Sequence, residues 1–520
     1  MHIVDNKALV FRTRNPDKYS IIPKHKVFDP DSDGIHEVAV YWGLDEARVL
    51  RNLGVKNVPS PITARYKWPG RFKPMQHQID TASFLTLHRR AFCFNDPGTG
   101  KTLSALWAAD YLIERGYVRR VLVLCPLSIM QSAWMQDINN SIMHRSAVVA
   151  HHSQSARRIE MIQQDYEFVI TNYDGLNLIA SEIRNNGRFD LIIVDEANAY
   201  KNPTTNRWKS LAAIIRPDTY LWMMTGTPAS QSPVDAYGLA KLVNPAGIPK
   251  FATAWREKVM NKVTMFKWAP KPDAAEQVHK VLQPAIRFTK AQCLDLPPVI
   301  TVTREVAMTP QQAKYYKILK EQMMITAAGE MISAVNAGVA VSKLLQISCG
   351  AAYTDDKEVV VFDASPRLNV LDEIMQETQR KVIIFALFRT SMDSISDFLT
   401  RKGYANAQIN GDVSASKRSK IIHDFQTTNN LQVLVMQPQA AAHGLTLTAA
   451  DTVVFFGPLM SVEMYTQCIA RADRKGQNSD KVTVVHIQSS PIEKELFSAM
   501  KTKVGDHAML VSLFNKALEI

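Results

Sequence analysis

The segment 95–102 reads NDPGTGKT and directly follows the apolar run 91–94. A short strand that breaks into a glycine-rich turn and restarts as an amphipathic helix is typical of a phosphate-binding loop. Gly98 and Gly100 would let the backbone curl, so that its amides and the helix N-terminus behind them face the phosphates of a nucleotide.

Two side chains at the end of this loop have the chemistry that such a site needs. Lys101 would contact the β and γ phosphates, and the Thr102 hydroxyl would bind Mg²⁺. The usual pattern begins with glycine, where this chain has Asn95. A glycine-rich turn without a ligand is therefore the alternative to a phosphate-binding loop.

Two adjacent acids stand at the end of another apolar run, in the segment 190–202, DLIIVDEANAYKN. Two carboxylates would be costly inside a core, but at the tip of a strand beside Mg²⁺ both have a use. Asp195 would bind the metal, and Glu196 would orient and deprotonate the attacking water. A solvated strand end without chemistry is the alternative. A further apolar run, 221–224, leads into the turn 225–228, TGTP, which is suited to sensing the γ-phosphate.

A glutamine lies about two dozen residues ahead of Lys101. Gln76 follows Pro74 and Met75 and opens an expected helix. Its amide both donates and accepts hydrogen bonds, so it could read the edge of an adenine. A solvated glutamine at a helix start is the alternative.

The elements that must hold these residues follow from the hydrophobic pattern. Apolar residues recur at helical spacing over 101–115, and this expected helix stops at Gly116. The fully apolar run 121–124 comes next, and 169–173 is a further expected strand. Strand, loop, helix and strand form a βαβ unit, and apolar strands predict a parallel sheet buried on both faces. Ligands bind at the carboxyl ends of such strands.

Composition bounds the class of protein. A chain of 520 residues predicts two or three domains. Its net charge of +12 favours a polyanionic partner, although a solvated basic surface is the alternative. No apolar run is long enough to cross a bilayer, and the first residues lack a signal-peptide core. Five scattered cysteines predict core residues in a reducing cytosol, with neither a zinc site nor a disulfide framework.

The first 70 residues carry no recognisable chemistry. They mix short β-like pieces with an expected helix at 44–53, and we expect an accessory lid. Tyr66, Trp68 or Phe72 could stack on a base, but packing against the main domain is the favoured use.

Six segments in order resemble the motifs of superfamily 2 helicases, and more narrowly those of the Swi/Snf-type ATPases. They are FKPMQHQ, NDPGTGKT, LVLCPLSIMQSAW, VITNYD, VDEANAYKN and MTGTPASQ. The second half agrees through IRFTK with the following LPP, through NGD, Arg418 and Phe425, through GLTLT at 444–448, and through QCIARADRKGQ at 467–477. The resemblance covers about residues 72–490, and the order of the motifs makes it specific.

The resemblance implies an α/β fold with two tandem RecA-like lobes, each with a parallel sheet. The expected divisions are an accessory region at 1–70, a first lobe at 71–249, a helical inter-lobe insertion at 250–364, a second lobe at 365–505 and a C-terminal helix at 506–520. It also implies hydrolysis of ATP with Mg²⁺. The expected catalytic residues are Lys101, Asp195, Glu196, Gln467, Arg471 and Arg474, and Thr102 and Asp195 are the expected metal ligands. The expected nucleotide-binding residues are Gln76, Asp96, Gly98, Thr99, Gly100, Lys101, Thr102 and Gly444.

Arg471 and Arg474 lie three residues apart, one turn of a helix, so both could point from one face toward a nucleotide held by the other lobe. Reaching the γ-phosphate when the lobes close would make them arginine fingers in cis. A solvated helix is the alternative.

Three departures from the family pattern concern Asn198 and Asp473, which replace histidines, and Thr446, which replaces asparagine. None removes a metal ligand, a base or a finger, so we expect hydrolysis to survive. The departures leave the relay between the ATP site and nucleic acid in question. Possible phosphate contacts are Arg89, Arg90, Lys417, Arg418 and Lys420.

The resemblance favours a minimal bacterial or phage motor that moves along duplex or branched DNA through backbone contacts. Fork remodelling, branch migration, repair or removal of bound protein would suit it. We expect a monomer in the cytoplasm of a bacterial or phage-infected cell, without a membrane or zinc. One alternative is a helicase that separates strands of DNA or RNA, and another is an ATP-gated DNA clamp with little turnover.

Overall fold

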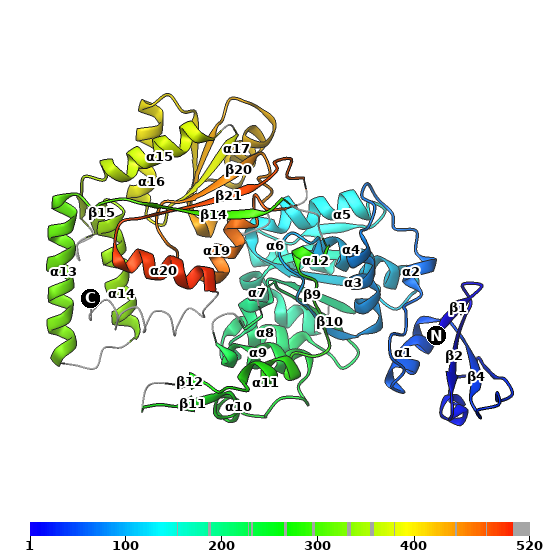
Figure 1. Ribbon diagram of the computed structural model, residues 1–520. Coiled ribbons are helices and arrows are strands. Elements are labelled where there is room, and N and C mark those ends of the chain that lie inside the picture. The colour runs from blue at the N-terminus through cyan, green and yellow to red at the C-terminus, as the bar shows by residue number, and fades with distance from the viewer. Residues whose placement is uncertain are drawn as a thin grey trace. The chain divides into compact units, whose positions relative to one another are not determined.

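The computed structural model describes residues 1–152, 154–185, 189–226, 228–229, 232–264, 268–293, 297–329, 334–353, 358–378, 380–441, 445–474 and 476–502. Contacts divide the chain into two compact units (Figure 1). The first comprises Met1–Pro228, Ala236–Trp255 and Ala275–Cys293. The second comprises Ala229–Asp235, Arg256–Ala274 and Leu294–Ile520. No helix among these described residues is long and apolar enough to cross a membrane.

The first unit contains a seven-stranded sheet in which every pairing is parallel. Its strands, in spatial order, are β13 (Ala285–Ile286), β5 (Arg90–Cys93), β10 (Tyr220–Met224), β9 (Leu191–Asp195), β6 (Val121–Cys125), β8 (Phe168–Asn172) and β7 (Ala147–Val149). All residues of β6, β9 and β10 are buried. The order therefore gathers the carboxyl ends of β5, β10 and β9 at one edge of the sheet, as the apolar runs predict.

Helices cover this sheet (Figure 1). They are α3 (Gln76–Leu87), α4 (Lys101–Glu114), α5 (Gln136–Ser141), α6 (Ser155–Gln163), α7 (Tyr173–Asn185), α8 (Asn206–Ile214) and α9 (Ala236–Val243), with short turns at 127–129, 130–135, 197–200 and 233–235. α3 packs along α4, and α7 packs along α8. The predicted helix 101–115 is confirmed to within one residue, because Gly116 has a positive φ of 74° that ends it.

The N-terminal region forms a four-stranded antiparallel sheet in the order β1 (His2–Val4), β2 (Ala8–Thr13), β4 (His36–Tyr41), β3 (His25–Val27), followed by α1 (Leu44–Asn52) and α2 (Ile62–Arg65). A single turn spans 16–19. Its apolar residues, Trp42 among them, belong to the same buried cluster as the parallel sheet.

Its attachment lies at the amino ends of the strands. Arg48 donates to the Thr86 carbonyl over 2.7 Å and to the Tyr220 hydroxyl over 2.8 Å, and Arg51 donates to the Leu87 carbonyl. These partners precede β5 or begin β10, whereas the phosphate loop follows β5. The expectation of a lid is therefore wrong for this region, which supports the opposite edge of the sheet.

Two aromatic residues of the connector pack inward, as favoured from the sequence. Tyr66 is buried and donates its hydroxyl to Asp110, and the Trp68 ring lies edge-on to Trp107 with centroids 5.7 Å apart. Phe72 is 41% exposed. Packing is thus confirmed for the first two rings.

The second unit has a six-stranded sheet, again with only parallel pairings. Its order is β14 (Val299–Glu305), β21 (Val482–Gln488), β20 (Ala450–Phe455), β17 (Lys381–Phe385), β19 (Val433–Met436) and β18 (Asn406–Ile409). Its helices are α13 (Pro310–Gly329), α14 (Ala334–Ser348), α15 (Ser365–Glu377), α16 (Arg389–Arg401), α17 (Ala415–Thr427), α18 (Pro438–Ala441), α19 (Val462–Ile469) and α20 (Pro491–Thr502), and β15 (Ala351–Tyr353) pairs with β16 (Val359–Val361). Two tandem parallel sheets confirm the predicted fold class.

The stretch expected as a helical insertion also contains strands. α10 (Ala252–Val259) and α11 (Ala274–Val281) flank an antiparallel hairpin of β11 (Met260–Lys262) and β12 (Trp268–Pro270). β13 joins the first sheet, α12 (Lys290–Cys293) follows, and β14 joins the second sheet. The expected C-terminal helix at 506–520 lies outside the described residues.

The cysteines behave mainly as core residues. Cys93, Cys125, Cys349 and Cys468 are buried, and Cys293 is partly buried. Burial raises the pKa of Cys93 to about 11 and that of Cys349 to about 12. These thiols therefore stay protonated near neutral pH, which is the behaviour expected of packing residues.

Candidate active site

The loop after β5 has the backbone that its glycines predict. Gly98 and Gly100 have φ values of 88° and 79°, in the left-handed region that favours glycine. A Cβ atom at Gly100 would also collide with the side chain of Gln78. Gly100 precedes Lys101, the first residue of α4, so the turn ends at a helix N-terminus. This is the geometry in which backbone amides receive phosphate oxygens.

Lys101 lies across its own loop. Its Nζ donates to the carbonyl of Asn95 over 2.9 Å and to that of Asp96 over 3.3 Å. The ammonium is therefore already at the loop backbone, beside any phosphate that the amides would receive. Thr102 follows it in the first turn of α4 and is only partly buried.

Two other predicted nucleotide-binding residues brace the turn through their side chains. Thr99 is buried and donates its hydroxyl to the Asp96 carbonyl over 2.8 Å. The Asp96 carboxylate accepts the amide N–H of Lys290 over 3.1 Å. These side chains shape the loop, and contact of their backbone with a nucleotide stays a prediction.

Asn95, the departure from the usual glycine, is an internal brace. It is 1% exposed, its Nδ2 donates to Thr81 Oγ1 over 2.9 Å, and its Oδ1 accepts the N–H of Phe288 over 2.9 Å. A buried amide with both ends hydrogen-bonded stabilises the position that it occupies. The substitution is therefore compatible with a working loop.

The start of α3 supports the loop from beneath. His77 Nε2 lies 2.8 Å from the carbonyl of Thr99, and Gln78 Nε2 donates to the same carbonyl over 3.4 Å. Gln78 Oε1 also accepts the Met75 N–H over 2.9 Å. Sequence reasoning missed both supports, although the spacing of Met75 and Gln78 matches a helix-start capping box.

The Gln76 side chain is hydrogen-bonded within its own helix. It is exposed, and its Nε2 donates to Asp80 Oδ1 over 2.9 Å on the next helical turn. A side chain on the solvent side of the helix start remains able to reach a base. Adenine recognition by Gln76 stays a prediction.

The two acids stand at the carboxyl end of β9. Asp195 is the last residue of the strand and is 8% exposed, and Glu196 follows with a left-handed φ of 49°. Such a backbone is unusual for a residue other than glycine and clusters at functional sites. It turns the chain sharply at the end of β9.

The Asp195 carboxylate is held on both oxygens. Oδ2 accepts the indole N–H of Trp134 over 2.9 Å, and Oδ1 accepts the amide N–H of Glu196 over 3.1 Å. Burial raises the pKa of Asp195, while the positive charge of Lys101 lowers it. The parallel pairing of β10 with both β5 and β9 brings the loop and the acids to the same edge of the sheet, so they share one site. Sequence reasoning noted Trp134 without assigning it this role.

These residues fit a magnesium ion. Each oxygen of the Asp195 carboxylate keeps a lone pair beyond its hydrogen bond, and a carboxylate with a threonine hydroxyl is the oxygen-rich set that Mg²⁺ prefers. A buried acid whose charge is costly is also one that a cation would stabilise. Asp195 and Thr102 would hold the ion.

The tip of β10 lies between the loop and the acids, because β10 pairs with β5 on one side and β9 on the other. The N–H of Thr225 donates to the Cys93 carbonyl over 3.0 Å. A Cβ atom at Gly226 would lie 2.6 Å from the Pro97 ring, so only glycine lets this turn touch the phosphate loop. Thr227 lies outside the described residues.

In the second unit, the structure brings Arg471 and Arg474 together. The Nη1 atoms of Arg471 and Arg474 lie 3.4 and 3.0 Å from the carbonyl oxygen of Leu445, to which both donate. Gln467 is 9% exposed within α19, and its Nε2 lies 3.4 Å from Glu463 Oε1. Gly444, which precedes Leu445, lies outside the described residues.

The helical placement predicted for the two arginines is wrong. α19 ends at Ile469, and the arginines lie in the turns that follow. The reason is a long-range hydrogen bond, because the Arg471 carbonyl accepts the N–H of Leu447 over 2.9 Å instead of an N–H of its own helix. The two arginines nevertheless lie together, because both donate to the Leu445 carbonyl from the turn that follows α19.

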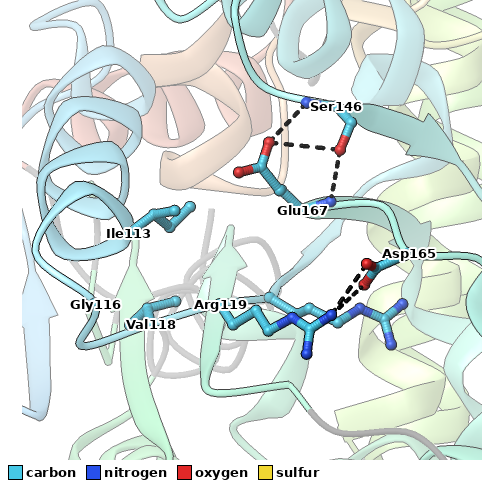
Figure 2. Close-up of a pocket in the computed structure, with 8 residues that line it drawn as sticks. Ile113, Gly116, Val118, Arg119, Ser146, Asp165 and Glu167 are labelled. Carbon is cyan, nitrogen blue, oxygen red and sulfur yellow. Dashed lines mark hydrogen bonds and ion pairs between the residues drawn. The ribbon is translucent and has the colours of Figure 1, made fainter.

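A pocket of about 480 Å³ lies at the opposite edge of the first sheet, where the strands begin (Figure 2). Arg119 donates to Asp165 over 3.0 Å, and Glu167 pairs with Arg145 over 2.7 Å and accepts the Ser146 N–H over 2.9 Å. None of the residues that line the pocket belongs to the phosphate loop. The lining residues are Ile113, Gly116, Val118, Arg119, Arg120, Ser146, Asp165 and Glu167.

Comparison with known proteins places this site in a family. The SNF2-related domain matches residues 77–349, and the helicase conserved C-terminal domain matches residues 366–476. The Mus musculus protein "Chromodomain-helicase-DNA-binding protein 1-like" is 25% identical over 486 residues, which is 88% of this chain and 53% of that protein. The Xenopus laevis "SWI/SNF-related matrix-associated actin-dependent regulator of chromatin subfamily A-like protein 1" is 24% identical over 424 residues, 78% of this chain and 40% of that protein.

Among solved structures, "Sulfolobus solfataricus SWI2/SNF2 ATPase core in complex with dsDNA" matches with 19% identity and a TM-score of 0.42, over 86% of this chain and 96% of that one. The chain spans about half the length, or less, of the curated relatives described above. The first domain match alone covers more than half of the chain and includes the whole phosphate loop, both acids and Trp134. The chain therefore belongs to the SNF2-related family of superfamily 2 ATPases.

Proposed function

We propose that this SNF2-related ATPase is a DNA-dependent motor that hydrolyses ATP, with Mg²⁺, to move along duplex or branched DNA. The observation that carries the proposal is the joint site at one sheet edge, where Lys101 lies across the phosphate loop, Asp195 ends β9 and Glu196 follows it. Fork remodelling, branch migration and removal of bound protein are the tasks that such a motor would serve.

Each residue has a defined part in hydrolysis. The loop amides and Lys101 bind the β and γ phosphates, and Glu196 orients the attacking water and accepts its proton. Asp195 and Thr102 hold Mg²⁺, which when bound neutralises charge on the phosphate oxygens. Trp134 fixes the rotamer of Asp195 by its hydrogen bond.

Arg471 and Arg474 are proposed to complete the site from the second unit. Their guanidinium groups would stabilise the charge that develops on the transferred phosphoryl group. Hydrolysis would then require the two lobes to close, which links ATP turnover to movement along the strand. Their shared contact with the Leu445 carbonyl supports a common orientation.

Charge supports a DNA partner. The net charge is +12, and the stretch from α10 to β11 exposes Arg256, Lys258 and Lys262 around the single acid Glu257. Lys417 and Lys420 are exposed on α17. Contacts from such residues to phosphates would make binding strongly dependent on salt and weakly dependent on sequence.

One of the earlier candidate contacts already has partners within the protein. The Arg90 guanidinium donates to the carbonyls of Arg216 and Leu242 at the amino edge of the first sheet. Two of its donors are therefore used internally, which favours the exposed lysines over Arg90 as phosphate contacts. Arg89, beside it in sequence, lies over the Tyr220 ring at 5.8 Å.

The decisive experiment measures ATPase rate and strand displacement together. Duplex DNA should raise the ATPase rate at least tenfold over the basal rate and support release of the third strand from a triplex. Tight ATP-dependent DNA binding with neither activity would favour the clamp. Release of a strand from a simple DNA or RNA duplex would favour a strand-separating helicase.

A further inference from the structure

Two neighbouring residues of the phosphate loop, Asn95 and Asp96, bind the backbone of the segment 288–290. Asn95 Oδ1 accepts the N–H of Phe288 over 2.9 Å, and Asp96 Oδ2 accepts the N–H of Lys290 over 3.1 Å. The Asp96 N–H donates in return to the Phe288 carbonyl over 2.9 Å. Both side chains therefore extend the pairing of β5 and β13 beyond the point where the two strands end.

The bound segment is the exit of the first unit. It follows β13, the edge strand of the first sheet, and the chain passes to the second unit after Cys293. The loop thus contacts residues that lead into α12, the last element of the first unit before the chain passes to the second. A displacement of these residues would therefore move the start of that connection.

The same two loop residues also bind the phosphate-binding lysine, but through other atoms. Lys101 Nζ donates to the carbonyls of Asn95 and Asp96. Each residue therefore contacts Lys101 with its backbone and the exit segment with its side chain. A phosphate that draws the ammonium away must change the hydrogen bonding of both peptide groups, and rotation of a peptide group moves the side chain beside it.

The hydrogen bonds of the Asn95 side-chain amide fix its orientation. Its Nδ2 is committed to Thr81 Oγ1 in α3, which directs Oδ1 to Phe288. The side chain is 1% exposed, so water cannot replace either partner without cost. Glycine, the usual residue here, would leave the Phe288 N–H without this acceptor.

We propose that Asn95 and Asp96 are positioning residues that transmit the nucleotide state of the loop to the exit segment, residues 288–290. The inference rests on the proposed function only in requiring that the loop binds ATP. The proposal also assigns a role to Asn95, the residue that departs from the usual glycine. Asn95 links Lys101, α3 and Phe288 through hydrogen bonds.

Hydrogen exchange of the peptides that cover 288–290 tests the proposal, with ATPγS as the probe and fluorescent nucleotide binding measured alongside. In the native protein, ATPγS should change the exchange rate of this segment about fivefold. This is the change in rate expected when the net free energy of one ordinary hydrogen bond is gained or lost. Asn95→Gly should exchange faster without nucleotide and lose the response to ATPγS.

A matched control is available in the same segment. Gln292 Oε1 accepts the Thr289 N–H over 2.9 Å without contacting the loop, so Gln292→Ala should speed exchange but keep the response. If Asn95→Gly folds poorly, Thr81→Val is the second variant. It removes the anchor of the asparagine amide, together with the bond from the Thr81 hydroxyl to the His77 carbonyl, and should weaken the response.

Three outcomes would overturn the proposal. The first is an unchanged exchange rate in native protein that binds ATPγS. The second is a normal response to ATPγS in both Asn95→Gly and Thr81→Val. Either would contradict the proposed link but leave the proposed motor function untouched. Failure of the native protein to bind nucleotide would remove the proposal and the proposed function together. DNA-stimulated ATPase activity, measured in parallel, separates the first two outcomes from the third.

Discussion

The indole nitrogen of Trp134 lies 2.9 Å from Oδ2 of Asp195, so a buried tryptophan fixes the acid that would bind Mg²⁺. Because Oδ1 is held by the Glu196 amide, the carboxylate has one orientation. Supports of this kind set the affinity of a metal site as much as the ligands do.

Trp134→Phe should therefore weaken metal binding without removing a ligand. We expect the Mg²⁺ concentration for half-maximal ATPase activity to rise about tenfold, with nucleotide affinity measured without metal little changed. Trp107→Phe is the matched control, since it removes another buried indole N–H, donated to the Pro69 carbonyl. An equal Mg²⁺ requirement in both variants would show that the indole does not orient the acid.

Glu196→Gln should separate binding from hydrolysis. The amide keeps the shape of the side chain but cannot take a proton from water, so phosphate release should fall by about 10²–10⁴ while ATP still binds. Lys101→Ala should lose both activities, because the loop loses its cation. Phosphate release and fluorescent nucleotide binding check the pair, and parental turnover in Glu196→Gln would exclude it as the base.

Arg471→Ala and Arg474→Ala should each lower kcat of the DNA-stimulated ATPase by about 10²-fold or more, with little change in ATP affinity. The reason is that an arginine finger acts on charge that appears only in the transition state. Arg401→Ala is a control, because Arg401 lies in the same unit but is exposed at the end of α16 and donates to the Asp397 carbonyl of its own helix. A loss confined to DNA affinity would place the two arginines outside the chemical step.

Stability of the first unit should fall as the pH drops from 6.5 to 4. Burial lowers the pKa of His88 from 6.5 to about 4, and its Nδ1 lies 2.7 Å from the Phe84 carbonyl. Between these two pH values His88 is protonated in the unfolded chain but stays neutral in the folded chain. The stability that neutral His88 contributes above pH 6.5 is therefore lost as the pH falls. The expected loss is about 2–3 kcal/mol.

Chemical unfolding of native protein and His88→Gln across this range measures the effect. Other groups also titrate as the pH falls, so the difference between the two slopes isolates His88. The variant should show the shallower pH dependence even if its stability at pH 7 is reduced. Identical slopes would mean that His88 titrates normally in the folded protein.

The buried pair of Arg367 and Glu493 should be critical to the second unit. Arg367 Nη2 lies 2.7 Å from Glu493 Oε1, and the side chains are 3% and 0% exposed. Glu493→Gln leaves a buried guanidinium without its counter-charge, which costs about 3–5 kcal/mol. Glu377→Gln breaks an exposed pair with Arg304 and should cost under about 1 kcal/mol in the same urea titration. Equal costs would contradict the assigned importance of burial.

The local pattern predicted much of this molecule correctly. The helix at 101–115 and the strand at 121–124 match α4 and β6 closely, because glycine, apolar runs and helical periodicity act over a few residues. Asp195 and Glu196 were placed at a strand end for the same reason. The order of the motifs then indicated the family, which the domain matches confirm.

Long-range pairing explains what the sequence could not predict. The helix of α19 ends before Arg471 because Leu447, from a distant segment, takes the Arg471 carbonyl. The N-terminal region supports the amino edge of the sheet because Arg48 reaches Tyr220. Neither partner is visible from the local pattern.

By itself, the sequence determined which residues can bind phosphate, metal and water, since those abilities belong to side-chain chemistry and to the short turns that present it. Only the tertiary structure decided what holds them. Trp134 is 61 positions from Asp195, and Asn95 is 193 positions from Phe288. Hydrogen bonds across such separations form because the parallel strands bring their ends to one edge, a consequence of packing the whole sheet.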